Sequence, residues 1–275
     1  MERIAGCPNL RDMGGIKVKN GYVKPGRLIR SGALWRLEDK DIEKLGSIAA
    51  VYDMRSENER AYHPDPEIPG AEYIHIPITE NGRRRFVQSK RTLPDKVEDM
   101  LEGYRRSEPA SAQRMREVYS GMVLSADAGR CLEGIIRTVV EQREGAVIYH
   151  CSAGKDRAGV ISALLLRLLG AEDSAIYADY LYTNTALSHE LEEAQSAALA
   201  LSGDERAANY VLGFFAACPC WLAAALDTLD KRFYSIEGYI AQMTKLTGWE
   251  TEEFKRICIE KSPELICTPF VRHVI

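Results

Sequence analysis

The fold is limited above all by a short apolar run followed by a helix that is apolar on nearly every face. Residues 146–149 have the character of a β-strand, and residues 160–169 that of a core helix ended by Gly170. A strand without polar alternation is typical of a parallel sheet covered on both faces. Residues 48–52 form a second such run. Strands that alternate with helices predict an α/β fold with a mainly parallel central sheet flanked by helices.

Local signals predict further elements around these strands. Ser56 and Glu59 offer a capping box for a helix that follows the first apolar strand. Apolar residues between 132 and 140 recur at helical spacing, and Gly145 is expected to end that helix. Residues 14–23 are expected to form short extended segments around an Asn-Gly turn.

The chain of 275 residues is expected to form a single domain, residues 1–275, although its length also fits two. Residues 80–128 are polar and weakly periodic, so we interpret them as a partly helical insertion and a candidate lid. Residues 172–261 are expected to form helices that pack against the sheet core.

The charge balance limits the classes of partner. The chain has 36 Lys and Arg against 40 Asp and Glu, a net charge of -4, which does not favour nucleic-acid binding through a global positive field. An anion site must therefore be local. Arg83, Arg84 and Arg85 could attract a phosphoinositide headgroup or an acidic phosphopeptide, but such a run is usually a solvated face.

The cysteine count and the apolar segments bear on the compartment. Seven cysteines, an odd number spread along the chain, indicate reduced thiols and a cytoplasmic location, and secretion without a visible signal peptide stays open. Residues 207–226 carry no charge and reach the length of a membrane span. Pro219 interrupts them, so we expect a buried helix pair and no integral membrane span.

The loop between residues 150 and 157 carries the chemistry. It runs from a buried strand into the N-terminus of a buried helix, where backbone N–H groups converge and attract an anion. Cys151 in this loop should ionise more readily than an ordinary thiol. Arg157 supplies a planar fork for two phosphate oxygens, and Gly154 lets the backbone turn. The alternative is a packed core thiol.

The sequence His-Cys-Ser-Ala-Gly-Lys-Asp-Arg at 150–157 resembles the signature of the cysteine-dependent protein tyrosine phosphatase superfamily. It is similar to the bacterial and fungal branch that includes secreted mycobacterial tyrosine and lipid phosphatases. Stretches at 9–15, 53–56 with Glu59, and 179–181 with Asn184 also match that branch. The resemblance spans roughly residues 5 to 260 and implies a tyrosine-phosphatase-like fold.

The resemblance implies roles for the loop residues. Cys151 would be the nucleophile, Arg157 would bind the transferring phosphoryl group, and Asp156 would be the general acid. Asp53, Asp95 and Asp99 are rival acids. Phosphate binding is expected from the loop: Ser152, Ala153, Gly154, Lys155 and Arg157, with Lys155 at the rim of the pocket. Residues expected to brace or contact the pocket are Arg11, Asp12, Asp53, Arg55 and His150. No second His or Cys stands at ligand spacing from His150, so no metal site is expected.

Two features depart from this pattern. Many superfamily members carry a hydroxyl residue directly after the arginine, whereas this chain has Ala158, and the lost hydrogen bond could slow the second step by on the order of 10–1000-fold. Ser152 is a nearby hydroxyl that could compensate. Cys218 and Cys220 flank a proline but lack the two-residue gap of a redox pair, so they are interpreted as packing residues.

These observations predict a phosphate monoester hydrolase that forms a cysteinyl-phosphate and needs no cofactor. A phosphotyrosine protein is the default substrate, and phosphoserine, phosphothreonine and phosphoinositides stay open because the sequence does not give the depth of the pocket. One alternative is a noncatalytic phosphate-binding module. Another is sulfur transfer on a cysteine loop.

Overall fold

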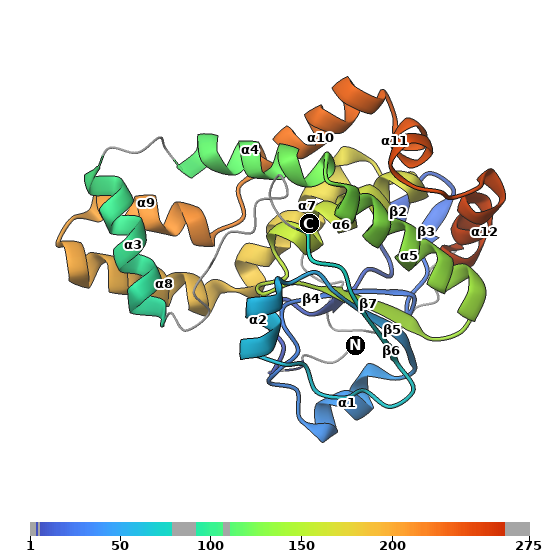
Figure 1. Cartoon of the computed structure of the whole chain (residues 1–275), viewed down its shortest axis with the longest axis horizontal. Helices are drawn as coiled ribbons and strands as arrows, with labels where there is room; N and C mark the ends of the chain where they lie inside the picture. The colour runs from blue at the N-terminus through green and yellow to red at the C-terminus, as the bar shows by residue number, and fades with distance from the viewer. Residues whose placement is uncertain (1–3, 5, 79–91, 107–110, 262–275) are drawn as a thin grey trace.

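The centre of the molecule is a five-stranded sheet in the order β1-β4-β7-β5-β6. The computed structural model describes residues 4, 6–78, 92–106 and 111–261. β4, β7, β5 and β6 run parallel to one another, and β1 pairs with β4 in the antiparallel sense. The strands are β1 (Arg11–Asp12), β4 (Leu28–Ser31), β5 (Ile48–Asp53), β6 (Glu72–His75) and β7 (Ala146–His150). The prediction of a mainly parallel sheet is confirmed (Figure 1).

β7 is the middle strand of the sheet, and both of its faces are apolar and covered. Val147 and Tyr149 belong to the larger core, whereas Ala146 and Ile148 belong to a smaller core on the opposite face. Side chains alternate between the two faces of a strand, so an unbroken apolar run is what a two-sided burial requires. The loop that follows β7 therefore opens at the middle of the sheet's carboxyl edge.

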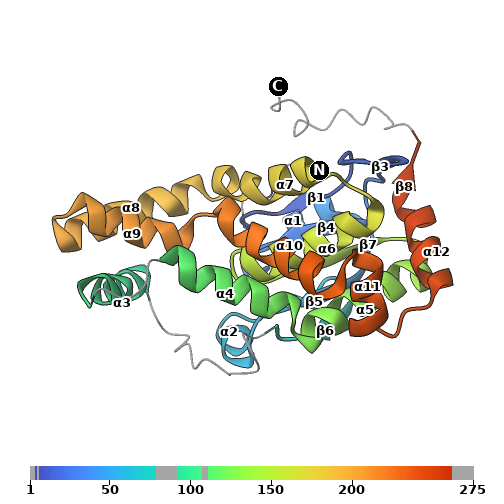
Figure 2. The same cartoon turned by 90° about the horizontal axis from the view of Figure 1, so that it is seen from above.

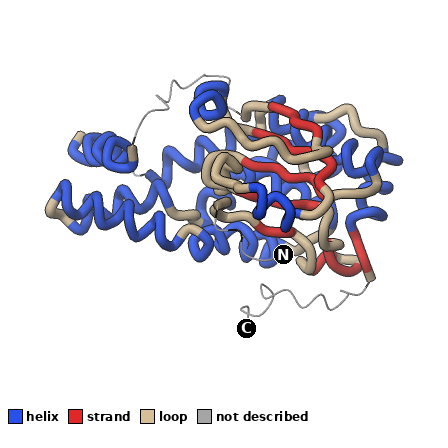
Figure 3. Tube along the Cα trace, turned by 90° about the horizontal axis from the view of Figure 1, so that it is seen from below, coloured by secondary structure: helices blue, strands red, loops and turns tan. Residues whose placement is uncertain are grey.

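Helices cover the larger core, and Figure 3 shows them behind the strands. α6 begins directly after the loop and ends at Gly170, which adopts the positive φ of 83° that glycine tolerates. The helices of this layer are α4 (Ser111–Val123), α5 (Ala126–Gln142), α6 (Asp156–Leu169), α7 (Asp173–Ala186), α10 (Pro219–Phe233), α11 (Ile236–Met243) and α12 (Gly248–Cys258). α1 (Asp39–Leu45) contributes to the smaller core through Leu45.

A helical extension projects from one side of this body (Figures 1 and 2). It consists of α3 (Leu93–Arg105), α8 (Ser188–Ser202) and α9 (Glu205–Phe215). Val97 and Leu101 of α3 pack on Ala198 and Val211, which gives the extension an apolar cluster of its own. The prediction of helices within residues 80–128 is confirmed for α3 and α4, and residues 79–91, which include Arg83 to Arg85, lie outside the described residues.

The local signals of the sequence agree with most of the remaining elements. α2 (Glu57–Tyr62) carries the predicted capping box. β2 (Lys17–Val18) and β3 (Gly21–Val23) form the expected hairpin, which β8 (Ile259–Glu260) extends to three strands. One boundary was wrong: α5 ends at Gln142, and the following Arg143 takes the left-handed conformation with φ 55° before Gly145 is reached.

The apolar segment around Pro219 is broken, as expected. α9 and α10 are separate helices that meet at an angle of 42°. Across the described ranges, no single helix is both long enough and apolar enough to cross a membrane, although this bent pair passes the same test when its two helices are taken together.

Candidate active site

The loop after β7 is held from behind by groups that bind its carbonyl oxygens. Asn9 Nδ2 donates to the carbonyls of Ala153 at 3.1 Å and Gly154 at 2.9 Å. The backbone N–H of Ala33 donates to the carbonyl of Ser152 at 3.0 Å. These contacts turn successive carbonyls away from the centre of the loop.

A buried cluster of charges supports the same carbonyls. Arg30 on β4 is fully buried and donates to the carbonyls of Gly154 at 2.9 Å and Lys155 at 3.1 Å. Its third contact is with Asp179, which also pairs with Arg11 at 2.6 Å. Burial alone would raise the pKa of Asp179, but the charges of Arg11 and Arg30 hold it below its usual range. Arg11 thus reaches the loop through Asp179, and its role as a bracing residue stays a prediction.

Gly154 allows the loop to approach the sheet. Its φ is +66°, and a Cβ atom there would lie 2.5 Å from the carbonyl oxygen of Ser31. The backbone amides of residues 152–155 donate to no acceptor within the described part of the chain. Together with the N-terminus of α6 they form a concentration of unpaired N–H groups, which favours an anion.

Cys151 lies at the carboxyl end of β7, directly before these amides, and is 2% exposed. The ionised thiol expected from the sequence stays a prediction. Ala158 is buried in the first turn of α6. Alanine offers no hydroxyl to the cysteine sulfur, and slow hydrolysis of the phosphocysteine also stays a prediction.

Arg157 is clamped by a carboxylate from α2. Its Nη1 donates to Glu59 Oε2 at 2.9 Å, and its Nη2 donates to Glu59 Oε1 at 2.8 Å. Nη1 also donates to the carbonyl of Met54 at 3.1 Å. Burial would raise the pKa of Glu59, but hydrogen bonds and charge from Arg157 outweigh it and hold the pKa far below its usual range. The guanidinium plane is therefore fixed beside the loop.

Glu59 was not among the predicted site residues, although the sequence predicted the capping box to which it belongs. Its Oε2 accepts from the backbone N–H of Ser56 at 2.8 Å, which is one half of the predicted capping box. The cap fixes the carboxylate that receives Arg157. Ser152 Oγ also donates to Glu59 Oε1, so the expectation that this hydroxyl could replace a hydroxyl at position 158 has no support in this structure.

Asp156 is the first residue of α6, and its side chain is 30% exposed. Its Oδ1 accepts a 2.6 Å hydrogen bond from the hydroxyl of Tyr119 on α4. Tyr119 is fully buried, and its oxygen lies 2.7 Å from that of Tyr180 on α7. Burial raises the pKa of Tyr119 well above its usual value, and the charge of Asp156 adds to this rise. Tyr119 is therefore a neutral donor that fixes one carboxylate oxygen, and sequence reasoning missed it.

Lys155 does not lie at the rim of the pocket, and that expectation was wrong. The residue is 4% exposed, and its Nζ donates to the carbonyls of Phe214 at 2.6 Å and Phe215 at 3.1 Å. Nζ also lies 5.0 Å from the centre of the Trp221 ring. The carbonyls at the end of α9 capture the ammonium group, so a phosphate contact from Lys155 would have to come from its backbone amide.

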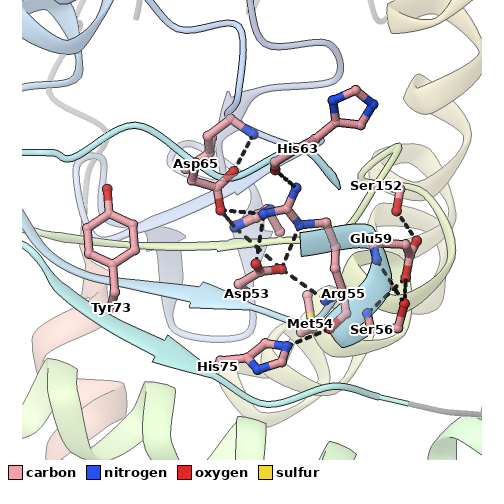
Figure 4. A network of polar contacts seen from close by, with 12 residues as sticks. Asp53, Met54, Arg55, Ser56, Glu59, His63, Asp65, Tyr73, His75 and Ser152 are labelled. Carbon is pink, nitrogen blue, oxygen red and sulfur yellow. Dashed lines mark hydrogen bonds and ion pairs between the residues drawn. The ribbon is translucent and has the colours of Figure 1, made fainter. Parts of the chain in front are cut away.

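Arg55 holds two carboxylates beside β5, as Figure 4 shows. It donates to both oxygens of Asp53 and to Asp65 Oδ2 at 2.7 Å. His150 Nε2 lies 3.1 Å from the same Asp65 oxygen. Ligand atoms of Asp53, Asp65 and His150 lie within 4.8 Å of one another, as a cation site would require. Arg55 already supplies positive charge to both carboxylates, and the bracing role of this cluster stays a prediction.

Four remaining candidates are held by other groups or lie on another element. Asp12 accepts from the backbone N–H groups of Gly14 at 2.8 Å and Gly26 at 2.6 Å, so its carboxylate holds two turns. Asp53 is committed to Arg55, which weakens its case as a rival acid. Asp95 closes the capping box of α3, and Asp99 lies on that same helix of the extension.

Comparison with known proteins decides the family. The sequence model described as "tyrosine phosphatase family" matches residues 2–260. This chain belongs to the tyrosine phosphatase family. It is a cysteine-based phosphatase, and the predicted class of enzyme is confirmed.

Named relatives agree with this family. The chain is 28% identical over 264 residues to the triple specificity protein phosphatase PtpB of Mycobacterium tuberculosis, covering 87% of this chain and 92% of the relative. It is 27% identical over 157 residues to a tyrosine-protein phosphatase of Nostoc commune, covering 55% and 46%. The crystal structure of P. aeruginosa TpbA matches 78% of this chain and 97% of its own at 16% identity, with a TM-score of 0.30 that is too low to carry an argument.

Proposed function

We propose that this phosphatase hydrolyses phosphotyrosine in proteins through a covalent phosphate on Cys151. The observation that carries the proposal is the loop itself. Its carbonyls are bound from behind by Asn9, Ala33 and Arg30, while the amides of residues 152–155 have no acceptor among the described residues. Such an array stabilises a phosphoryl group whose charge increases as the transition state forms. The tyrosine phosphatase family match supports phosphotyrosine as the substrate.

In the first step, the thiolate of Cys151 attacks the phosphorus atom while the bond between phosphorus and the tyrosine oxygen breaks. Arg157, held by Glu59, binds the phosphoryl oxygens through Nε–H and through the Nη2–H that donates to Ser152 Oγ in this structure. Asp156 gives its proton to the departing phenol oxygen. Tyr119 occupies Oδ1 of Asp156, which leaves Oδ2 as the oxygen available for proton transfer.

In the second step, a water molecule attacks the phosphocysteine. The carboxylate of Asp156 accepts a proton from this water, phosphate forms, and the thiolate of Cys151 leaves. Without a hydroxyl at position 158, the leaving thiolate relies on the loop amides and Arg157 for stabilisation. We therefore expect hydrolysis of the intermediate to be the slower step.

The relatives suggest a wider substrate range. The mycobacterial relative is named a triple specificity phosphatase. In this chain, the ammonium group of Lys155 is bound to carbonyls at the end of α9 and is not available to a second phosphate. This favours monophosphorylated substrates and gives no support to selection of polyphosphorylated phosphoinositides through Lys155.

The test compares the wild-type protein with Cys151→Ser. Rapid mixing of the wild type with p-nitrophenyl phosphate should give a burst of nitrophenol followed by a slower steady rate, and Cys151→Ser should give neither. Acid-quenched wild type should carry one phosphate, which mass spectrometry of the peptide containing Cys151 detects. Binding of phosphate without any turnover by the wild type would instead identify a noncatalytic module.

A further inference from the structure

A pair of thiols lies at the junction between α9 and α10, outside the machinery described above. Cys218 is the residue before α10, Cys220 is in its first turn, and Pro219 separates them. Their Sγ atoms are 2.8 Å apart. Bonded sulfurs are about 2.05 Å apart, so a movement of less than about 1 Å would join them.

The pair is also more accessible than the other thiols. Cys218 and Cys220 are half-buried, whereas the other free cysteines of the described ranges are buried: Cys7, Cys131, Cys151 and Cys258. Partial burial and the hydrogen bond with Cys218 raise the pKa of Cys220, and a hydrogen bond and positive charge from Arg116 on α4 oppose that rise. Arg116 therefore favours a negative charge on the pair as it reacts.

We infer that Cys218 and Cys220 form a redox-active dithiol that a hydroperoxide oxidises to an intrachain disulfide. One thiolate attacks the O–O bond, becomes a sulfenic acid and releases the alcohol. The second sulfur then displaces hydroxide from the first, forming the S–S bond and releasing water. Two protons and two electrons leave the thiols, and the hydroperoxide is reduced to an alcohol and water.

The junction that carries the pair is tied to the active site at two points. The ammonium group of Lys155 binds the carbonyls of Phe214 and Phe215 just before the pair and lies over the ring of Trp221 just after it. The ring of Trp221 also packs against that of Tyr119, with 6.0 Å between the two ring centres. Bond formation must shift the first turn of α10, so it should disturb both attachments.

The effect on catalysis follows from these attachments and rests on the proposed function. Tyr119, which Trp221 contacts, fixes Asp156, and Lys155 is part of the phosphate-binding loop. A misplacement of about 1 Å can cost up to about 100-fold in rate, and we expect a reversible fall of roughly tenfold here.

The bond can be tested without any reference to catalysis. Trypsin cleavage after Arg206 and Lys231 yields a peptide that contains Cys218 and Cys220 and no other cysteine. After limited hydrogen peroxide and iodoacetamide, this peptide should be lighter by two hydrogen atoms than the dithiol form and should carry no alkyl group. Dithiothreitol before alkylation should restore two alkylated cysteines. Two alkylated cysteines after peroxide alone, at a dose that oxidises Cys151, would overturn the inference.

The link to catalysis has its own controls. Cys220→Ser removes the disulfide and retains Cys151, and Cys258→Ala removes a distant buried thiol as a matched change. Mild peroxide should lower turnover of the wild type and Cys258→Ala reversibly, and Cys220→Ser should lose less activity. Equal losses in all three proteins would assign the effect to oxidation of Cys151 and overturn the link. If none of the proteins had phosphatase activity, the proposed function would fail while the peptide assay still tested the disulfide.

Discussion

Two arginine–carboxylate clusters lie on opposite sides of the same loop, and they differ in burial and in what they hold. Behind the loop, Arg11 and Arg30 share Asp179, and all three side chains are almost inaccessible to solvent. In front of it, Arg157 and Glu59 form a pair whose side chains are 19% and 24% exposed. The rear cluster positions backbone carbonyls, whereas the front pair positions a side chain for substrate. We therefore expect damage behind the loop to appear mainly in stability, and damage in front to appear mainly in catalysis with a smaller cost in stability.

The largest effect is expected from Asp179→Asn. Two buried guanidinium groups would lose their shared negative charge, and an uncompensated buried charge typically costs about 3–5 kcal/mol. Chemical denaturation should show that loss in the free energy of unfolding. Asp173→Asn, at the exposed start of the same helix, is the matched control and should change it by less than about 1 kcal/mol. Equal values for the two variants would contradict the division between rear and front clusters.

The next effect is expected from Arg157→Lys. Lysine keeps the charge but not the planar fork, and loss of a preorganised donor to the transition state costs about 100- to 1000-fold in kcat. Stopped-flow measurements with p-nitrophenyl phosphate would measure this loss. The free energy of unfolding should fall much less than in Asp179→Asn. A variant that unfolds as easily as Asp179→Asn would show that the front pair is structural as well.

The front pair also predicts a dependence of stability on pH. Arg157 holds the pKa of Glu59 below its ordinary value, so the pair stabilises the fold fully above that ordinary value, which is 4.5. The stabilisation is lost as pH falls from there through the depressed pKa of the folded state. Glu59→Gln should therefore cost about 2 kcal/mol at pH 7, the scale of a charged hydrogen bond, and progressively less below pH 4.5. Denaturation curves at a series of pH values would check this, and a pH-independent cost would contradict the assignment.

The two clusters also differ in how well a sequence reveals them. Ser56 and Glu59 are three residues apart, so their capping box could be predicted from local spacing, although the partner of Glu59 could not. Arg30 contacts Asp179 across 149 positions, and nothing near Arg30 in the sequence distinguishes it from an ordinary strand residue. Its role depends on the pairing of β4 with β7 and on the docking of α7.

Lys155 shows the same limit, but here the sequence suggested a wrong position and did not merely miss a contact. A lysine in a polar loop is usually exposed, which led to the wrong expectation of a rim position. The carbonyls that bind it belong to a junction about 60 residues away in the sequence. Sequence patterns thus predicted the strand, the glycine turn and the core helix that create the loop, but not the distant groups that complete it.

The smallest effect is expected from Tyr119→Phe, which removes a hydroxyl and keeps the ring. Asp156 would lose the donor that fixes Oδ1 and could rotate away from the leaving oxygen, for which we expect roughly a tenfold fall in kcat, a modest part of the gain from general acid catalysis. The fall should be seen with phenyl phosphate, whose leaving group needs the proton, and should nearly vanish with a dinitrophenyl ester. Tyr182→Phe, on the same helix as Tyr180, is the matched hydroxyl deletion. It should leave the ratio of the kcat values for the two substrates unchanged. If Tyr119→Phe slowed both substrates equally, Tyr119 would act on the loop as a whole and not on the proton donor.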